Sequence, residues 1–86
     1  MFVIDDEAHA EMQSGEFATL ADAINELRRL SAIPWDSEPN RAPCTNWRNC
    51  GRRYEIVEYD ETTEPRRELQ RLSGMDIGAS GVTWHV

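Results

Sequence analysis

Two cysteines and two histidines are the residues of this 86-residue chain that could bind a soft metal ion or do thiol chemistry. Cys44, Cys50, His9 and His85 could together supply the four ligands of a Cys2His2 zinc site. Structural zinc sites usually pair their ligands as C-x2–4-C and H-x3–5-H, and neither spacing occurs in this sequence. We therefore expect no metal and no other cofactor, with zinc or thiol chemistry at these four residues as the alternative.

Catalysis by either thiol would need a histidine base beside the sulfur atom and a third group that orients the histidine. His9 and His85 lie near opposite ends of the sequence, and nothing in the sequence brings either of them to a cysteine. Glycine-rich phosphate loops and metal-hydrolase helices are absent as well. The residue types favour a protein without a catalytic site.

Aromatic and basic residues gather in one proline-rich stretch, residues 33–54, which is the best candidate for a binding surface. Trp, Tyr and Arg dominate the energetics of protein–protein interfaces, and a stiff chain loses less entropy on binding. The pattern predicts a protein-interaction or regulatory module. Its candidate contact residues are Trp35, Arg41, Trp47, Arg48 and Arg52. The competing interpretation is that the two tryptophans of the stretch only complete a small hydrophobic core.

The arginines of this stretch also suggest weak nucleic-acid binding. Six of the nine arginines lie between Leu27 and Tyr54, where only two acids accompany them. The whole chain nevertheless carries a net charge of −7, which would repel a phosphate backbone. Pairing of these arginines with acids of the same chain is the simpler interpretation. We therefore expect another protein, and not a nucleic acid, as the partner.

The backbone between the two cysteines decides their chemistry. Pro43 suits the first turn of a helix, and Gly51 suits the left-handed residue that ends one. A helix would place Cys44, Trp47 and Cys50 on one apolar stripe facing the core. The Cα atoms of the cysteines would then be about 9 Å apart, too far for a disulfide. An open loop would instead allow the bridge, although a reducing compartment favours free thiols.

The element that must position this stretch is an amphipathic helix, predicted from Leu20 to about Ala32. Thr19 and Asp22 form an acidic variant of the capping box at its start. Apolar residues then recur at helical spacing, namely Leu20, Ala23, Ile24, Leu27 and Leu30. The pattern indicates a helix that covers a sheet with its apolar side.

Strands are predicted on both sides of the helix. Arg52–Asp60 is the clearest, and its apolar residues on both faces indicate a central strand. Phe2–Asp5 is expected to be a short strand. Ala8–Gln13 alternates as a returning strand would, although Glu7–Gln13 also has the composition of a helix.

The last third of the chain is predicted to add strands as well. Pro65–Ser73 suits either a strand or a short helix, and we favour a strand. From Ile77 onward, apolar residues alternate around a Ser80-Gly81 turn, which predicts a hairpin. Trp84 in this hairpin is expected to pack under the helix.

One run of residues resembles a known type of protein. The run begins with IPWD at Ile33, continues with PN, APC, W and CGR up to Arg52, and ends with EYD at Asp60. It is similar to small uncharacterised bacterial proteins of this length that have a helix before the run and a strand after it. The resemblance implies a bacterial, cytoplasmic protein and brings no activity with it.

Together these patterns predict one α+β domain over residues 1–86, with a mainly antiparallel sheet and one helix packed on one of its faces. The sequence has no leader-like segment and no apolar run near 18 residues, so we expect a cytoplasmic protein that does not contact a membrane. A chain of this length buries only about 60 to 65% of its extended surface, and a homodimer would add to that.

Overall fold

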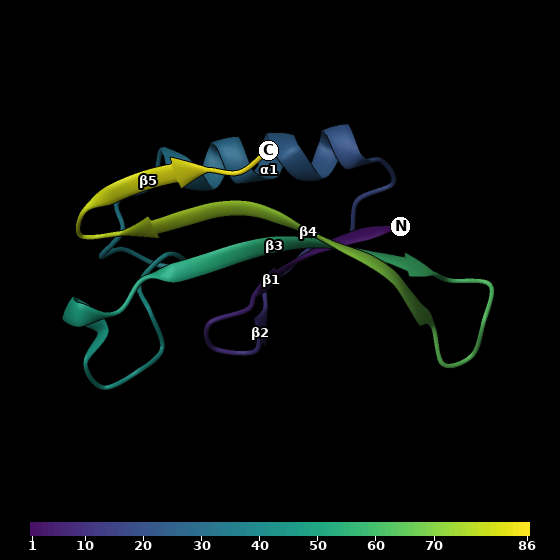
Figure 1. Cartoon of the computed structure of the whole chain (residues 1–86), viewed down its shortest axis with the longest axis horizontal. Coiled ribbons are helices and arrows are strands. Elements are labelled where there is room, and N and C mark those ends of the chain that lie inside the picture. The colour runs from purple at the N-terminus through teal and green to yellow at the C-terminus, as the bar shows by residue number, and fades with distance from the viewer.

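Five antiparallel strands and one helix make up the structure, a computed structural model that covers residues 1–86 (Figure 1). The elements in chain order are β1 (Phe2–Asp6), β2 (Glu11–Met12), α1 (Leu20–Ser31), η1 (Trp47–Asn49), β3 (Arg52–Asp60), β4 (Arg67–Gly78) and β5 (Gly81–Trp84). Within the sheet the strands lie in the order β2-β1-β3-β4-β5. Every neighbouring pair is antiparallel. The predicted α+β class is confirmed.

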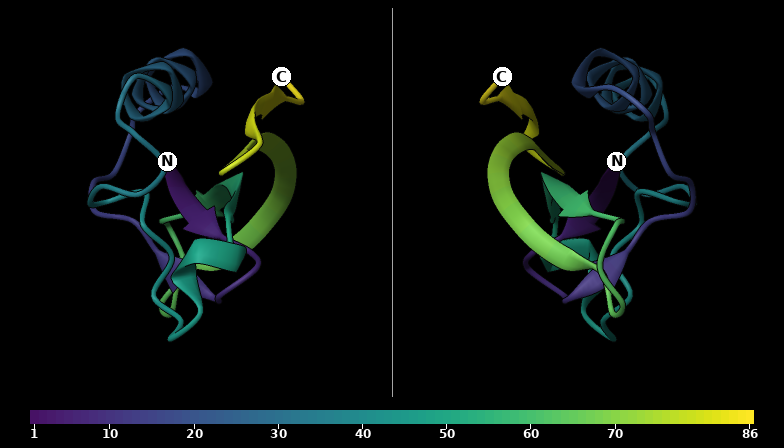
Figure 2. Two further views of the ribbon diagram at one scale, coloured as in Figure 1. Left: turned by 90° about the vertical axis from the view of Figure 1, so that its left-hand side faces the viewer. Right: turned by 90° about the vertical axis from the view of Figure 1, so that its right-hand side faces the viewer.

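Helix α1 covers one face of the curved sheet, as Figure 2 shows in both end views. Thr19 is its N-cap, and the Thr19 Oγ1 atom accepts a hydrogen bond of 3.1 Å from the backbone N–H of Asp22. The buried side of the helix presents Ala23, Leu27 and Leu30 to the sheet. The predicted helix is therefore confirmed, and it ends one residue earlier than expected. No helix of the chain is long and apolar enough to span a membrane.

Strand β3 lies at the centre of the sheet, as its apolar residues on both faces predicted. Tyr54 and Ile56 point toward α1 and belong to the core cluster, and Val57 is buried on the opposite face. The eight buried residues of that cluster are Ile4, Ala23, Leu27, Leu30, Tyr54, Ile56, Met75 and Ile77. They come from β1, α1, β3 and β4, so one layer of side chains joins the helix to three strands.

Gly74 in β4 allows the helix to approach the sheet closely. A Cβ atom at this position would lie 2.7 Å from the Leu27 Cδ1 atom and 2.9 Å from the Tyr54 carbonyl oxygen. Both distances are shorter than van der Waals contact, so any larger residue would displace the Leu27 side chain and the backbone of β3 at Tyr54.

The N-terminal hairpin contains the returning strand predicted within Ala8–Gln13, but this strand is shorter than expected. The helix predicted as an alternative is absent, and only Glu11–Met12 forms the returning strand β2. The reason is the Asp6 carboxylate, because its Oδ1 atom accepts a hydrogen bond of 3.1 Å from the Ala8 N–H and turns the chain. Ala10 completes the turn with a left-handed φ of 52°.

The C-terminal strands were predicted in type, but their bounds differ. Arg67–Gly78 is one strand of 12 residues, β4, which joins the expected Pro65–Ser73 strand to the first arm of the hairpin. The hairpin is confirmed, but its turn consists of Ala79 and Ser80, one residue earlier than predicted, and Gly81 is already the first residue of β5. Trp84 does not pack under the helix: it is 42% exposed and lies outside the core cluster, because β5 is an edge strand that pairs only with β4.

Candidate functional site

The connection between α1 and β3, residues 32–51, is fastened to the fold by one buried side chain, Asn40, which is 1% exposed. Its Nδ2 atom donates hydrogen bonds of 2.7 Å and 2.9 Å to the carbonyl oxygens of Leu30 and Ile33. Its Oδ1 atom accepts a hydrogen bond of 2.9 Å from the Tyr54 hydroxyl. Asn40 therefore ties the connection to the end of α1 and to the central strand at once.

Arg52, the first residue of β3, fixes the middle of the same connection. Its side chain is only 3% exposed. Its Nη1 atom donates to Asp6 Oδ2 at 3.0 Å and to Glu11 Oε1 at 2.8 Å. Its Nη2 and Nε atoms donate to the carbonyl oxygens of Arg41 and Asn40, at 2.7 Å and 3.3 Å. Burial alone would lower the pKa of Arg52, but these charged hydrogen bonds raise it above its ordinary value. The prediction that Arg52 contacts a partner is therefore corrected: its donors are used inside the fold.

The Asp6 carboxylate is fully buried and accepts four hydrogen bonds. Its Oδ2 atom lies 3.0 Å from Arg52 Nη1 and 2.6 Å from His9 Nδ1. Its Oδ1 atom accepts from the backbone N–H groups of Ala8 and Arg53, both at 3.1 Å. A buried carboxylate with this many donors is fully compensated, and it holds the His9 ring in one orientation.

The Tyr54 hydroxyl gives the fold a pH dependence in the alkaline range. Burial raises the pKa of Tyr54 to about 12, against the opposing effect of Arg52 and with the help of the carboxylates of Asp6, Glu11 and Glu38. The folded state holds this proton more tightly than the unfolded state, whose tyrosine has a pKa near 10. Stability is therefore fully present below pH 10 and is lost as the pH rises toward 12. Over that interval the free energy of unfolding should fall by about 2 to 3 kcal/mol.

Urea denaturation at a series of pH values from 8 to 12 measures this loss. The decline should be much smaller in Tyr54→Phe, which has no proton to lose at this position, and should persist in the control variant Tyr59→Phe. An equal alkaline decline in wild type and Tyr54→Phe would contradict the prediction.

Trp35 and Trp47 form a pair whose ring centroids are 5.9 Å apart with an angle of 46° between the ring planes. The guanidinium carbons of Arg41 and Arg48 lie 5.6 Å and 4.8 Å from the centroid of Trp47. Both tryptophans are half-buried, and both arginines are exposed. Trp35 also packs against the core cluster, whereas Trp47 does not. We call these four residues the Trp–Arg face.

The arginines of the chain differ in whether a carboxylate of the same chain pairs with them. Seven of the nine do, including Arg41 with Glu38 at 3.1 Å and Arg53 with Glu7 at 3.0 Å. Arg48 is the arginine of residues 33–54 that has no such partner, and it is exposed on top of Trp47. The intramolecular pairing that the sequence suggested as the simpler interpretation accounts for the other arginines of this stretch.

Cys44 and Cys50 are joined by a disulfide, so the open-loop alternative is correct and the predicted helical stripe is wrong. Only Trp47–Asn49 is helical, as the short 3-10 helix η1. At Cys50 the backbone already has the extended conformation of β3, with φ −106° and ψ 155°. The helix therefore ends after one turn, where the extended backbone that leads into β3 begins.

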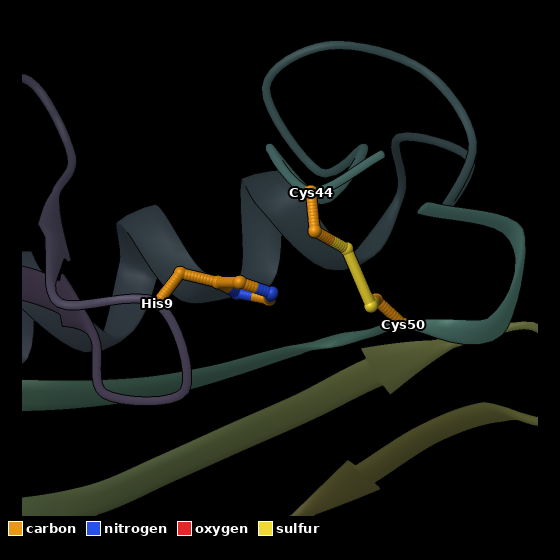
Figure 3. A group of neighbouring side chains, drawn as sticks. All are labelled: His9, Cys44 and Cys50. Carbon is orange, nitrogen blue, oxygen red and sulfur yellow. A yellow bond between two sulfur atoms is a disulfide. The ribbon is translucent and has the colours of Figure 1, made fainter. Parts of the chain in front are cut away.

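His9 joins the two cysteines in space, although nothing in the sequence placed it there. The candidate ligand atoms of His9, Cys44 and Cys50 lie within 4.8 Å of one another. Figure 3 shows the imidazole ring of His9 pointing from the β1–β2 turn toward the disulfide. His85 lies elsewhere, with its Nε2 atom 3.1 Å from Asp76 Oδ2, so the four-residue set considered from the sequence becomes a set of three.

No protein-family model, no curated protein and no solved structure matches this chain. The resemblance to small bacterial proteins therefore stays a prediction. The structure offers two candidate sites on the connection before β3: the Trp–Arg face, and the cluster of His9, Cys44 and Cys50.

Proposed function

We propose that this chain is a non-catalytic interaction module that binds, through the Trp–Arg face, a segment of another protein that presents a carboxylate beside an apolar side chain. The proposal rests on the environment of Arg48, which is stacked on Trp47 and is not paired with a carboxylate. Its guanidinium lies 4.8 Å from the ring centroid of Trp47, is exposed, and has no carboxylate of its own chain within ion-pair distance. A guanidinium stacked on an indole keeps its N–H donors free for bidentate contact with a carboxylate.

Arg41 supports the same partner chemistry. Its ion pair with Glu38 joins two exposed side chains, and such pairs contribute only about 0 to 1 kcal/mol. A carboxylate of a partner can replace Glu38 at little cost. Two arginines flanking a tryptophan pair therefore suit a partner segment that presents carboxylates beside an apolar side chain.

The connection is also held in place before binding. Asn40 and Arg52 fasten its first half to α1, β1 and β3 through buried hydrogen bonds that do not depend on the redox state of the cysteines. A surface that is already ordered loses little conformational entropy on binding. A bacterial origin and a cytoplasmic location, as expected from the sequence, belong to this proposal.

Trp47→Ala should separate binding from folding. Trp47 is half-buried and lies outside the core cluster, so we expect the free energy of unfolding to fall by no more than about 1.5 kcal/mol. Affinity for the partner should fall by about 30-fold or more, because central tryptophans of interfaces contribute at least about 2 kcal/mol. The partner is sought by crosslinking and quantitative affinity capture from a bacterial lysate, and its affinity for each purified variant is then titrated.

Arg28→Ala is the matched control, because Arg28 is also exposed and also has no carboxylate partner, but lies on α1. A true partner is retained by wild type and Arg28→Ala and is lost from both Trp47→Ala and Arg48→Ala. Capture that is insensitive to the Trp47 and Arg48 variants would refute the proposal. Binding to DNA or RNA that weakens steeply with salt would replace it with the nucleic-acid alternative.

A further inference from the structure

We propose that the Cys44–Cys50 disulfide and His9 form a redox-controlled zinc site, a property that goes beyond the proposed interaction with a protein. In the disulfide state the sulfur atoms are bonded to each other and no metal binds. When the disulfide is reduced, the two thiolates and the His9 imidazole become three ligands for one Zn²⁺ ion.

The three ligands already converge. Their candidate ligand atoms lie within 4.8 Å of one another, and they come from the β1–β2 turn and from both ends of the segment that contains η1 (Figure 3). On tetrahedral zinc, with bonds of about 2.0 to 2.3 Å, two ligand atoms are about 3.5 to 3.8 Å apart. The Cα atoms of Cys44 and Cys50 are 7.4 Å apart, which leaves room for the sulfur atoms to separate to that distance. Small side-chain rotations are therefore enough to form the site.

The orientation of His9 is the second observation. Its Nδ1 atom lies 2.6 Å from Asp6 Oδ2, so a proton on Nδ1 is donated to this buried carboxylate. The lone pair is then on Nε2, the ring nitrogen that is left for a metal. Zinc-bound histidines typically donate their other N–H to a carboxylate in this way. Asp6 is itself held by Arg52 and by two backbone N–H groups, so the ring is positioned before any metal arrives.

The donor set selects the metal. Two thiolates and one imidazole are soft or borderline ligands that suit Zn²⁺ and not Mg²⁺ or Ca²⁺, which prefer oxygen. Three protein ligands leave a fourth tetrahedral position for water. An open cleft of about 680 Å³ adjoins the site, and His9, Cys50, Arg48 and Arg53 are among the residues that line it. Solvent can therefore reach the fourth position.

The chemistry of the switch balances with a dithiol as the reductant. The dithiol gives two electrons and two protons to the Cys44–Cys50 bond and becomes a disulfide itself, while the protein gains two thiols. Binding of Zn²⁺ then releases the two thiol protons to solvent as the Zn–S bonds form. In the oxidised state the disulfide links Cys44 to Cys50. In the reduced state the metal links the same two cysteines to each other and to His9 of the β1–β2 turn, so a covalent or coordinate bond constrains the segment around η1 in both states.

Metal binding by the full chain tests the site. The protein is reduced anaerobically, the reductant is removed, and Co²⁺ is added as a spectroscopic probe before Zn²⁺. We expect one equivalent of Co²⁺ with the thiolate-to-metal absorption and intense visible bands of tetrahedral cobalt, and displacement of Co²⁺ by Zn²⁺. The disulfide form should bind neither. A reduced protein without the thiolate absorption would overturn the proposal.

The two histidines of the chain provide a readout that needs no variant. Zinc should shift the imidazole nitrogen resonances of His9 in the reduced protein and leave those of His85 in place. His9→Gln should weaken zinc binding by about 10- to 100-fold or more, with His85→Gln as the matched control that binds like wild type. Unshifted His9 resonances, or an unchanged affinity in a folded His9→Gln variant, would remove His9 from the site and overturn the assignment.

Discussion

Replacing Arg52 with methionine should lower the free energy of unfolding by about 3 to 5 kcal/mol. The variant keeps most of the apolar stem of the side chain but removes every guanidinium donor. The Asp6 carboxylate, which is fully buried, would lose its ionic partner. A buried charge without its counterion is far more costly than the absence of both charges. The connection would also lose the hydrogen bonds that Arg52 donates to the carbonyl oxygens of Asn40 and Arg41.

Arg53 provides the control for this experiment. It is the next residue along β3 and pairs with Glu7 at 3.0 Å, but the two side chains are 63% and 46% exposed. Arg53→Met should therefore cost no more than about 1 kcal/mol in urea denaturation. Adding Asp6→Asn to Arg52→Met should recover part of the loss, because it removes the uncompensated charge. Equal costs for Arg52→Met and Arg53→Met would show that burial of the ion pair does not govern stability here.

The parts of the fold that were predicted correctly are those with local signals. Helix α1 has a capping residue and a regular apolar side, and β3 has apolar residues on both faces of a nine-residue strand. Each signal lies within a dozen consecutive residues, so neither depends on distant contacts. The bounds of β2 and β4 depended on partners elsewhere in the sequence and were predicted less well.

The different environments of Arg52 and Arg53 could have been predicted from the alternation of side chains along the strand. Side chains of a strand alternate between its faces, so Arg52 lies on the buried face of Tyr54 and Ile56, and Arg53 lies on the other. The prediction of Arg52 as a contact residue of the binding surface ignored this alternation. The partner of Arg52 could not be predicted in this way, because Asp6 is 46 residues away in the sequence.

The cluster of His9, Cys44 and Cys50 could not be predicted for a similar reason. It requires the β1–β2 turn, in which the alanine at position 10 adopts a left-handed φ of 52° without a glycine or asparagine to indicate it. It also requires the connection to lie beside the β1–β2 turn, where Arg52 links Asp6 to the carbonyl oxygens of Asn40 and Arg41. Contacts between side chains far apart in sequence therefore decide the candidate site, and the local patterns decide the scaffold.

Asn40→Ala should lower the free energy of unfolding by about 3 kcal/mol. The Tyr54 hydroxyl would be left buried without its partner, which costs about 1 to 3 kcal/mol. The carbonyl oxygens of Leu30 and Ile33 would each lose one hydrogen bond, although that of Leu30 still accepts from the Ile33 N–H. Tyr54→Phe removes only one of these hydrogen bonds and should cost about 1 kcal/mol. Urea denaturation of the three proteins gives this ranking directly. Asn46→Ala is the control, since that side chain is exposed and makes no capping hydrogen bond, and it should stay within about 0.5 kcal/mol of wild type.

The same Asn40→Ala variant also tests whether the buried core supports the binding surface. Trp35 lies between Ile33, whose carbonyl oxygen accepts from Asn40, and Asn40 itself. Loss of the hydrogen bonds of the Asn40 side chain should let Trp35 move relative to Trp47, because Trp35 is then restrained mainly by its packing on the core cluster and by the ring contact at 5.9 Å. The exciton coupling of the two indoles in circular dichroism should therefore weaken under conditions in which the variant is still folded. An unchanged exciton signal in a destabilised Asn40→Ala would mean that the disulfide segment alone orders the Trp–Arg face, and that Asn40 serves the helix end without serving the binding surface.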